Sequence, residues 1–303
     1  MHPLCRPALI VAIAAGPILA ADRLPDDYPA QIESWRTARE ARLRSDDGWL
    51  TVAGLFWLHD GENRFGSDPS GEIALPAGSS PARAGRFDLK EGRVTVSIEP
   101  GVTATSGGAP VTTMPMRPDT AGEPDLLTLG DLTLFVIERG GRPAIRLRDK
   151  NSAMRRDFKG LTWFPVDPAY RVIASFVKYD PPRIIPIPNI LGQTEPLPCP
   201  GALTFSLKGR PFRLEPVLEE PGAKELFVIF RDQTSGRGTY PSGRFVYTDL
   251  PKDGKVVLDF NKAYNPPCAF TPYATCPLPP KQNILAIPID AGERDNGHHA
   301  AQK

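Results

Sequence analysis

The chain has 303 residues, enough for one large all-β domain or two small ones, and 41% of them are hydrophobic, as in a globular protein. With 36 basic against 35 acidic residues, the composition argues against a nucleic-acid-binding protein and against a polybasic membrane patch, because both need clustered positive charge. Proline is the outlier: 35 residues is about twice ordinary usage and favours short strands and turns over helices.

The amino terminus is typical of an export signal. Arg6 gives a basic start, residues 8–15 form a short apolar run, and a small-residue cleavage site follows at Ala20 or Ala21. An apolar run this short is well under the roughly 20 residues that a membrane-spanning helix needs. We therefore expect residues 1–21 to be a signal peptide, and the mature chain to be periplasmic or secreted with no transmembrane segment after cleavage.

One helix is predicted, from Pro29 to Arg44. Proline in the first turn is typical of a helix start, and Ile32, Trp35 and Leu43 fall near one face. Because Trp35 would otherwise lie in water, we expect this helix to brace the edge of a sheet.

From Leu50 onward, short apolar or alternating runs separated by turns predict strands. Four two-residue turns are flanked by such runs and predict hairpins: Glu91-Gly92, Gly140-Gly141, Lys208-Gly209 and Asp253-Gly254. Further runs predict strands at residues 161–166, 171–179, 183–187 and 225–230.

About a dozen strands with one N-terminal helix imply a mainly β fold, either an antiparallel sandwich or a partly closed barrel. We expect a single domain over residues 22–293. The polar residues 294–303 are expected to form a disordered tail.

Residues 259–280 form the most unusual segment, with six prolines, two cysteines and two tyrosines. Prolines remove backbone donors, so the segment can be neither helix nor sheet and must be held by side chains and turns. Its aromatic residues argue against disorder. We interpret it as the ordered wall of a site and predict that Tyr264, Asn265 and Tyr273 bind a ligand, with Tyr264 donating hydrogen bonds or stacking on a ring.

Loss of the signal peptide leaves three cysteines, an odd number in a compartment that allows disulfides. The simplest pairing joins Cys268 to Cys276, which would contribute roughly 2.5 kcal/mol on the chain-entropy model. Cys199 is then left over, and its pairing with either of the others is the alternative. We predict no metal site, because two thiolates without a nearby histidine leave zinc short of ligands.

Signatures of common catalytic and cofactor sites are absent from the sequence. There is no GxSxG, HExxH, phosphate loop or GxGxxG, so we expect no cofactor. The mature chain holds three histidines, and His298 and His299 lie in the tail. A Ser-His-Asp triad would therefore have to use His59, which is better interpreted as a hydrogen-bonded turn residue.

A polar loop at residues 231–245 supplies the catalytic candidates. It follows a buried apolar strand, and strand-end loops are where rigid scaffolds display polar groups. We predict Asp232 as acid, base or orienter, Arg244 as an anion clamp, and Ser235 and Tyr240 as the remaining polar groups of the site. The alternative is that Asp232 and Ser235 only satisfy a tight glycine turn.

Three long runs are distinctive: GWLTVAGLFWLHDGENRFGS, FRDQTSGRGTYPSGRFVY and DFNKAYNPPCAFTPYATCPLPPKQNILAIPIDAGE. They resemble the bacterial and archaeal family catalogued as domain of unknown function 1684, and the resemblance extends from about Trp35 to Glu293. It implies a single domain that contains both candidate segments, and it carries over no activity. The similar runs RLRD and FPVDPAYR add Arg146, Asp149 and Arg171 as candidate site residues.

These features predict an exported, mainly β protein in which residues 231–245 and 259–276 form a polar ligand-binding or catalytic cleft. Its partner would be an unknown small molecule or a component of the envelope. If the protein is an enzyme, a hydrolase is favoured, although no nucleophile is identified and Ser235 is the one hydroxyl to test. The alternative is a non-catalytic structural or interaction module of the envelope.

Overall fold

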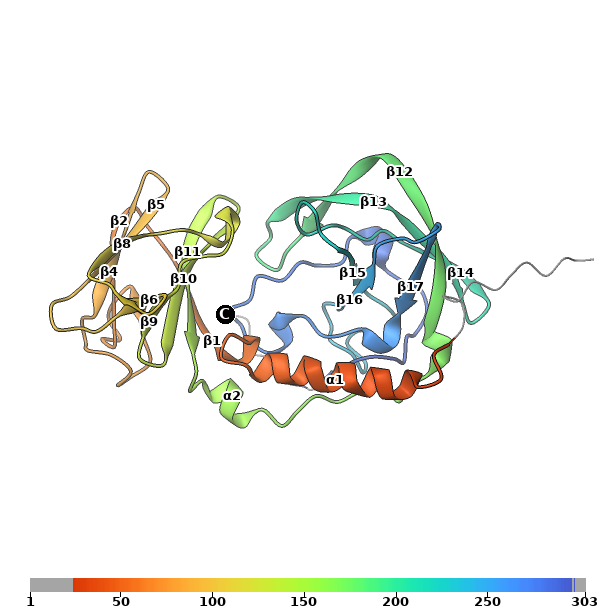
Figure 1. The fold of residues 1–303 in the computed structure, drawn as a ribbon, viewed down its shortest axis with the longest axis horizontal. Helices are drawn as coiled ribbons and strands as arrows, with labels where there is room; N and C mark the ends of the chain where they lie inside the picture. The colour runs from red at the N-terminus through yellow and green to blue at the C-terminus, as the bar shows by residue number, and fades with distance from the viewer. Residues whose placement is uncertain (1–23, 296, 298–303) are drawn as a thin grey trace, which may run out of the picture.

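Two β lobes lie side by side in the computed structural model, which describes residues 24–295 and 297 (Figure 1). The N-terminal lobe is residues 52–149; the C-terminal lobe is residues 153–295 together with the helix α1 (Tyr28–Arg44). The described chain is mostly β, with several antiparallel sheets in a sandwich-like arrangement and no closed barrel, which confirms the predicted class. The predicted signal peptide and most of the predicted tail lie outside the described residues.

The N-terminal lobe consists of two sheets. One holds, in spatial order, β1 (Val52–Trp57), β11 (Arg142–Asp149), β10 (Leu132–Arg139), β9 (Leu127–Leu129), β6 (Thr105–Ser106) and β7 (Ala109–Pro110). The other holds β3 (Ile73–Ala74), β2 (Gly61–Gly66), β4 (Gly85–Lys90), β5 (Arg93–Ile98) and β8 (Thr113–Met116).

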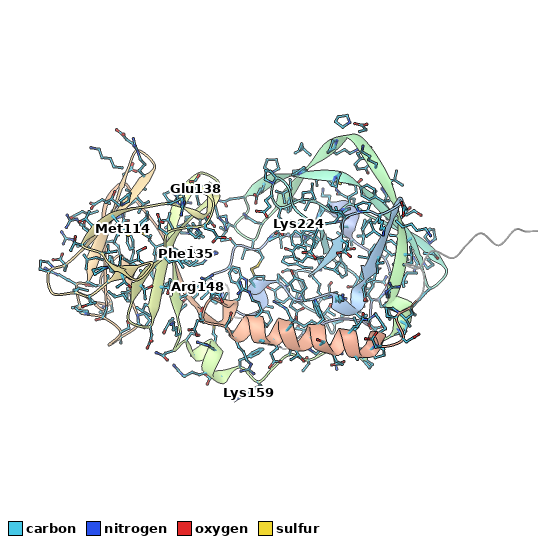
Figure 2. The ribbon with its side chains drawn as sticks, viewed as in Figure 1. Met114, Phe135, Glu138, Arg148, Lys159 and Lys224 are labelled. Atoms are coloured by element: carbon cyan, nitrogen blue, oxygen red, sulfur yellow. A yellow bond between two sulfur atoms is a disulfide. The ribbon has the colours of Figure 1, made fainter. Side chains whose placement is uncertain are left out.

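Alternation of apolar residues builds the core between these sheets. Phe87 of β4 lies opposite Val96 of β5, and both are fully buried in one cluster with Leu134 and Ile145 of the other sheet. Side chains two residues apart point to the same face of a strand, so each strand buries one face and leaves the other outside this core. Figure 2 shows side chains filling the lobe, with Phe135 on the sheet nearest the C-terminal lobe.

The C-terminal lobe combines two sheets with several short helices. A four-stranded sheet holds β14 (Arg210–Leu214), β13 (Thr194–Leu207), β12 (Arg171–Pro188) and β17 (Lys255–Asp259), and a pair holds β15 (Glu225–Phe230) and β16 (Arg244–Asp249). The shorter helices of the chain are α2 (Ala153–Asp157) and the 3-10 turns Trp49–Thr51, Asp119–Ala121, Pro168–Tyr170, Phe260–Lys262, Pro267–Ala269 and Lys281–Asn283. Within the described residues, no helix is long and apolar enough to cross a membrane.

β15 lies between two hydrophobic cores of the C-terminal lobe. Its sequence LFVIF has no polar position, and all five side chains are buried. Leu226, Val228 and Phe230 join the core beside the four-stranded sheet, whereas Phe227 and Ile229 join the core beside the disulfide-containing segment. Burial on both faces explains why this strand is continuously apolar rather than alternating.

The predicted helix is confirmed, with α1 beginning one residue earlier than expected. Ile32 and Leu43 are buried, and Trp35 packs edge-on against Trp163 with ring centroids 5.6 Å apart. α1 lies along the C-terminal lobe (Figure 1), so its apolar face is buried by chain that follows it by more than a hundred residues.

Three of the four predicted hairpins are confirmed, at Glu91-Gly92, Gly140-Gly141 and Lys208-Gly209. At the fourth, the predicted turn forms, but the strands on either side of it do not pair with each other. Asp253 and Gly254 do turn through positive φ (52° and 70°), but β16 pairs with β15 and β17 pairs with β12. Lys252 and Lys255 exchange backbone hydrogen bonds of 2.9 Å across the turn, and beyond it the Thr248 hydroxyl of β16 donates to the carbonyl of Val257 of β17.

The predicted strand at residues 161–166 is wrong. Pro165 lacks a backbone donor, and a single bridge between Trp163 and Glu293 replaces a ladder. The nearby Arg294 amide donates to the carbonyl of Thr162 at 2.8 Å, so the chain is held as far as the beginning of the predicted tail.

Candidate functional site

A pocket of about 500 Å³ lies between the first half of α1 and one end of the strands β12, β15, β16 and β17. Tyr28, Ile32 and Trp35 line the pocket from the helix, and Tyr247 and Tyr264 line it from the strands and loops of the C-terminal lobe. Small-molecule sites in proteins have volumes of roughly 300 to 1,000 Å³. The pocket is therefore large enough for a small molecule, and four aromatic side chains are among the residues that line it.

A buried hydrogen-bond network fixes one side of the pocket. The Tyr28 hydroxyl donates to the carboxylate of Asp259 at 3.0 Å, and the Asn261 amide donates to the Tyr28 oxygen at 2.9 Å and to Asp259 at 3.1 Å. Burial, followed by the charge of Asp259, raises the pKa of Tyr28. The phenol therefore stays protonated and ties α1 to the end of β17.

Stacked aromatic rings form the opposite side. Tyr247 stacks on Phe227 with centroids 4.7 Å apart, and on Tyr264 with centroids 6.3 Å apart and planes 17° apart. The guanidinium of Arg39 lies 4.4 Å from the centroid of Tyr264. The Tyr247 hydroxyl donates to Glu219, and burial raises the pKa of both tyrosines. Tyr247 and Tyr264 of this stack both line the pocket.

Charges of both signs line the mouth of the pocket. Glu225, Asp249 and Asp259 supply carboxylates, and Arg171 and Lys262 supply cations. Two of the residues predicted to bind a ligand, Arg171 and Tyr264, line this pocket. They were predicted from separate segments of the sequence. The arrangement suits a polar ligand that carries a ring, because aromatic faces hold the ring and charged groups hold its substituents.

Asp232, predicted as a catalytic residue, and Arg244, predicted as an anion clamp, lie elsewhere, in the interior. Their side chains are 1% and 0% exposed and form an ion pair of 2.9 Å. Arg244 also donates to the carbonyls of Ala291, Ile289 and Glu293. Burial is the main influence on Arg244 and lowers its pKa, while Asp232 opposes that effect. No face of this guanidinium is open to a ligand, which favours a structural role for the pair.

The rest of the loop 231–245 is also engaged locally. Asp232 accepts from the amide and hydroxyl of Thr234 at 2.7 and 2.6 Å, and the Ser235 hydroxyl accepts from the Asp232 amide at 3.4 Å. Tyr240 is 4% exposed, and burial raises its pKa. The histidine within the described residues, His59, is an exposed turn residue of the N-terminal lobe, bonded through its backbone to Asn63. No described histidine therefore accompanies Ser235.

The segments 231–245 and 259–276 do touch, but they do not share the pocket. Phe245 and Tyr264 exchange backbone hydrogen bonds of 2.9 Å. The pocket is lined by residues of the second segment and by none of the first. Sequence reasoning missed Tyr28 and Tyr247. Tyr28 meets Asp259 across 231 residues of chain, and no local pattern signals a contact of that separation.

Asn265 lies behind Tyr264, next to an acid that sequence reasoning also missed. The backbone amide of Asn265 donates to the Glu293 carboxyl at 3.2 Å, and the guanidinium of Arg39 lies 3.7 Å from the same carboxyl. Glu293 is fully buried, and burial raises its pKa to about 7. Its Oε1 has no hydrogen-bond partner among the described residues. A glutamate ahead of a polar tail gives no sequence signal for such burial.

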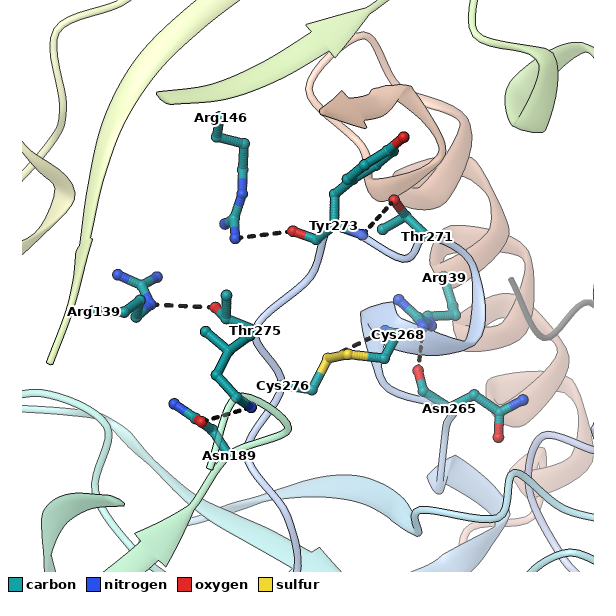
Figure 3. Close-up of a disulfide and its surroundings, with 11 residues drawn as sticks. Arg39, Arg139, Arg146, Asn189, Asn265, Cys268, Thr271, Tyr273, Thr275 and Cys276 are labelled. Atoms are coloured by element: carbon teal, nitrogen blue, oxygen red, sulfur yellow. Dashed lines mark hydrogen bonds between the residues drawn. A yellow bond between two sulfur atoms is a disulfide. The ribbon is translucent and has the colours of Figure 1, made fainter. Parts of the chain in front are cut away.

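The proline-rich segment holds the disulfide between Cys268 and Cys276, whose α-carbons are 6.3 Å apart (Figure 3). The buried Cys199 is free, and burial raises its pKa to about 11. The Thr271 hydroxyl bonds to the carbonyl of Val52 at 2.9 Å, so side chains and turns hold this segment as expected. Across the described residues, no group of three His, Cys, Asp or Glu side chains is placed to hold a metal ion.

Tyr273 and Arg146 lie apart from the pocket, at the junction of the lobes. Tyr273 is 36% exposed, and its carbonyl oxygen accepts a 3.4 Å hydrogen bond from Arg146 (Figure 3). Asp149 is buried, and its carboxylate accepts from the backbone amide of Asn151 at 2.8 Å, which closes the turn after β11.

Fold and site together define a two-lobed, mainly β protein with an aromatic, charged pocket beneath its long helix. Residues 156–294 of the chain match the family described as protein of unknown function (DUF1684). This match confirms the predicted resemblance, over a shorter stretch than expected: the run at residues 48–67 lies outside it.

Solved structures with similarity to this chain cover less than half of it. A solution NMR structure of an uncharacterised protein from Haloarcula marismortui is 36% identical and covers 46% of this chain and 78% of its own, with a TM-score of 0.38. An FHA domain crystallised with an intracellular domain of another protein is 17% identical and covers 30% of this chain and 84% of its own, with a TM-score of 0.22. No curated protein matches the chain.

Proposed function

We propose that the protein is an exported ligand-binding protein of the cell envelope, and that its site is the pocket between α1 and the ends of β15, β16 and β17. The observation that carries the proposal is the pocket itself, about 500 Å³ in volume and lined by four aromatic side chains and five charged ones. The export signal predicted over residues 1–21 supports a location in the periplasm or outside the cell.

The ligand class follows from the lining. Tyr28, Trp35, Tyr247 and Tyr264 offer rings and phenolic groups, and such rings stack on flat faces of a ligand while their polar ends reach its hydroxyl groups. The carboxylates and cations at the mouth suit a ligand with several polar substituents. A saccharide or another polar, ring-bearing metabolite of the envelope fits both features.

Binding is favoured over catalysis by the residues present. The described residues that line the pocket include no serine, cysteine or histidine, so the nucleophile that a hydrolase of the predicted kind would use is missing there. Burial raises the pKa of Tyr247 and of Tyr264, which keeps both phenols neutral rather than available as a base.

The test is ligand-induced thermal stabilisation of the mature protein. A panel of monosaccharides, amino sugars and aromatic metabolites is screened, because a ligand at about 100 times its Kd stabilises the folded state by about 2.7 kcal/mol, roughly 5 °C for a chain of this size. We expect Arg171→Gln and Trp35→Leu to lose the shift and Lys252→Gln, on an exposed turn, to keep it. A hit whose shift survives in both pocket variants would contradict the assignment of the site, and a panel without hits would favour the second candidate below.

The second candidate is a non-catalytic structural module of the envelope. It is favoured by Asp232 and Arg244, which were expected to face a ligand and instead pair in the interior and bind three backbone carbonyls. On this proposal the distinctive runs act as staples for the C-terminal lobe, and the pocket binds nothing.

A further inference from the structure

Four arginines share one face of the N-terminal lobe. Arg142, Arg146 and Arg148 alternate along β11, so their side chains leave the sheet on the same side, while Ile145 and Leu147 point into the core. Arg139 of β10 lies directly opposite Arg142 and shares this face. We call Arg139, Arg146 and Arg148 the junction arginines, because this face is directed at the C-terminal lobe (Figures 2 and 3).

The proline-rich segment lies across the junction arginines. Arg146 donates to the Tyr273 carbonyl at 3.4 Å, and Arg139 donates to the Thr275 hydroxyl at 3.3 Å. Figure 3 shows both guanidinium groups directed at this segment, beside the disulfide. The two lobes therefore meet at a point where one side contributes mainly positive charge and the other contributes backbone and hydroxyl groups.

The positive charge of this face is not balanced. Arg139 pairs with Asp119 at 2.8 Å, but within the described chain no carboxylate lies within 4.0 Å of Arg146 or Arg148. Arg146 is only 5% exposed, and the Nε atoms of both arginines are buried without a hydrogen-bond partner. Burial, with the repulsion of Arg139 and Arg148, lowers the pKa of Arg146 to about 10.

A buried guanidinium without an anion is costly, because its desolvation is not offset by a partner. Aromatic rings cover part of it: Arg146 lies 5.3 Å from the ring centroid of Trp49, and Arg148 lies 4.8 Å from that of Phe135. Ring contact occupies the face of a guanidinium and leaves the N–H groups at its edge, which match the geometry of a carboxylate, phosphate or sulfate.

We propose that the junction arginines form a binding site for a small oxyanion between the two lobes. Arg146 supplies the buried charge and Arg148 a second, half-buried one. Arg139 and the Thr275 hydroxyl border the site from the side of Asp119. A bound phosphate or sulfate group would satisfy the donors that the protein leaves without partners, and would sit on residues of both lobes at once. The site shares no residue with the pocket beneath α1 and does not depend on the proposed function.

Inorganic phosphate and sulfate are the probes. The mature protein is titrated by calorimetry and thermal unfolding at constant ionic strength, with chloride as the reference anion, so that screening by salt is equal throughout. We expect saturable binding of at least one tetrahedral anion, with affinity reduced at least about tenfold in Arg146→Gln and in Arg148→Gln. Arg93→Gln is the matched control, since this residue is in the same lobe and its side chain is 85% exposed.

If Arg146→Gln does not fold, Arg148→Gln provides the test, because Arg148 is only half-buried. Arg146→Lys offers a further comparison, because lysine keeps the charge and loses the planar fork; we expect its affinity to lie between those of the original protein and Arg148→Gln. The proposal is overturned if neither anion binds above the chloride reference, or if the arginine variants bind as tightly as the control.

Discussion

Replacing Arg244 by leucine should destabilise the protein severely without touching the pocket. The substitution leaves the carboxylate of Asp232 buried at 1% exposure without its cation, and breaking a buried pair from one side costs about 3 to 5 kcal/mol. The carbonyls of Ala291 and Ile289 also lose a donor, which costs roughly 1 to 3 kcal/mol for each group left unsatisfied. The remaining donors to Asp232, which are the amide and hydroxyl of Thr234 and the backbone amide of Ile289, limit the loss. We expect about 4 kcal/mol or more.

Urea unfolding followed by tryptophan fluorescence measures this loss. With a denaturant slope of about 3 kcal/mol per molar, the midpoint should fall by more than about 1 M. Arg237→Leu is the matched control, because Arg237 is exposed in the same loop and should change stability by less than about 0.5 kcal/mol. The double variant Asp232→Asn/Arg244→Leu should cost less than the sum of its single changes, since two removed charges leave none stranded. A midpoint within about 0.3 M of the original protein would refute the structural role and restore the anion clamp predicted from the sequence.

Three further outcomes follow from buried groups of the C-terminal lobe. Glu293 has a folded-state pKa near 7, above its unfolded value, so its own contribution to stability should be fully present in acid and be lost between about pH 4.5 and pH 7, by up to about 1.4 kcal/mol per pH unit; Glu293→Gln should remove this loss from the profile of stability against pH, and an unchanged profile would contradict it. Replacing Cys268 and Cys276 by alanine should cost about 2.5 kcal/mol, and peptide mapping should find Cys199 as the free thiol; a bridge to Cys199 would disprove the pairing. Gly243→Ala should cost several kcal/mol by urea unfolding, because its φ is +102° and an added Cβ would lie 2.5 Å from the carbonyl oxygen of Phe230; a near-neutral change would contradict this packing.

Local patterns predicted local structure well. The amphipathic run of α1, the positive-φ turn residues Glu91 and Lys208, and the apolar strand β15 each specify their element through neighbours in sequence. The turn at Asp253 has the same chemistry as the others, yet its flanking strands enter different sheets. Turn residues set the direction of the chain, whereas partners far away in sequence decide which strand is paired.

For the candidate site too, the sequence predicted what local patterns determine and missed what distant contacts determine. Tyr264 and Arg171 were predicted to bind a ligand and do lie in one pocket, but the half of that pocket formed by α1 could not be foreseen. Polarity alone also misled at Arg244, because a charged residue after an apolar strand looks the same whether the loop opens to water or folds inward over carbonyl groups. Burial is decided by tertiary packing, and a single sequence does not report it.

The route of the chain through the two lobes has a consequence for biosynthesis. α1 is made first and belongs to the C-terminal lobe, yet residues 52–149 are then inserted as a complete lobe before its partners appear. The first and last strands of this lobe pair with each other, with Val52 opposite Arg148. The N-terminal lobe can therefore fold before the partners of α1 have been synthesised. The bond from Tyr28 to Asp259 closes only when nearly all of the chain has emerged. The pocket beneath α1 is therefore completed late, and ligand binding becomes possible only as the final step of folding.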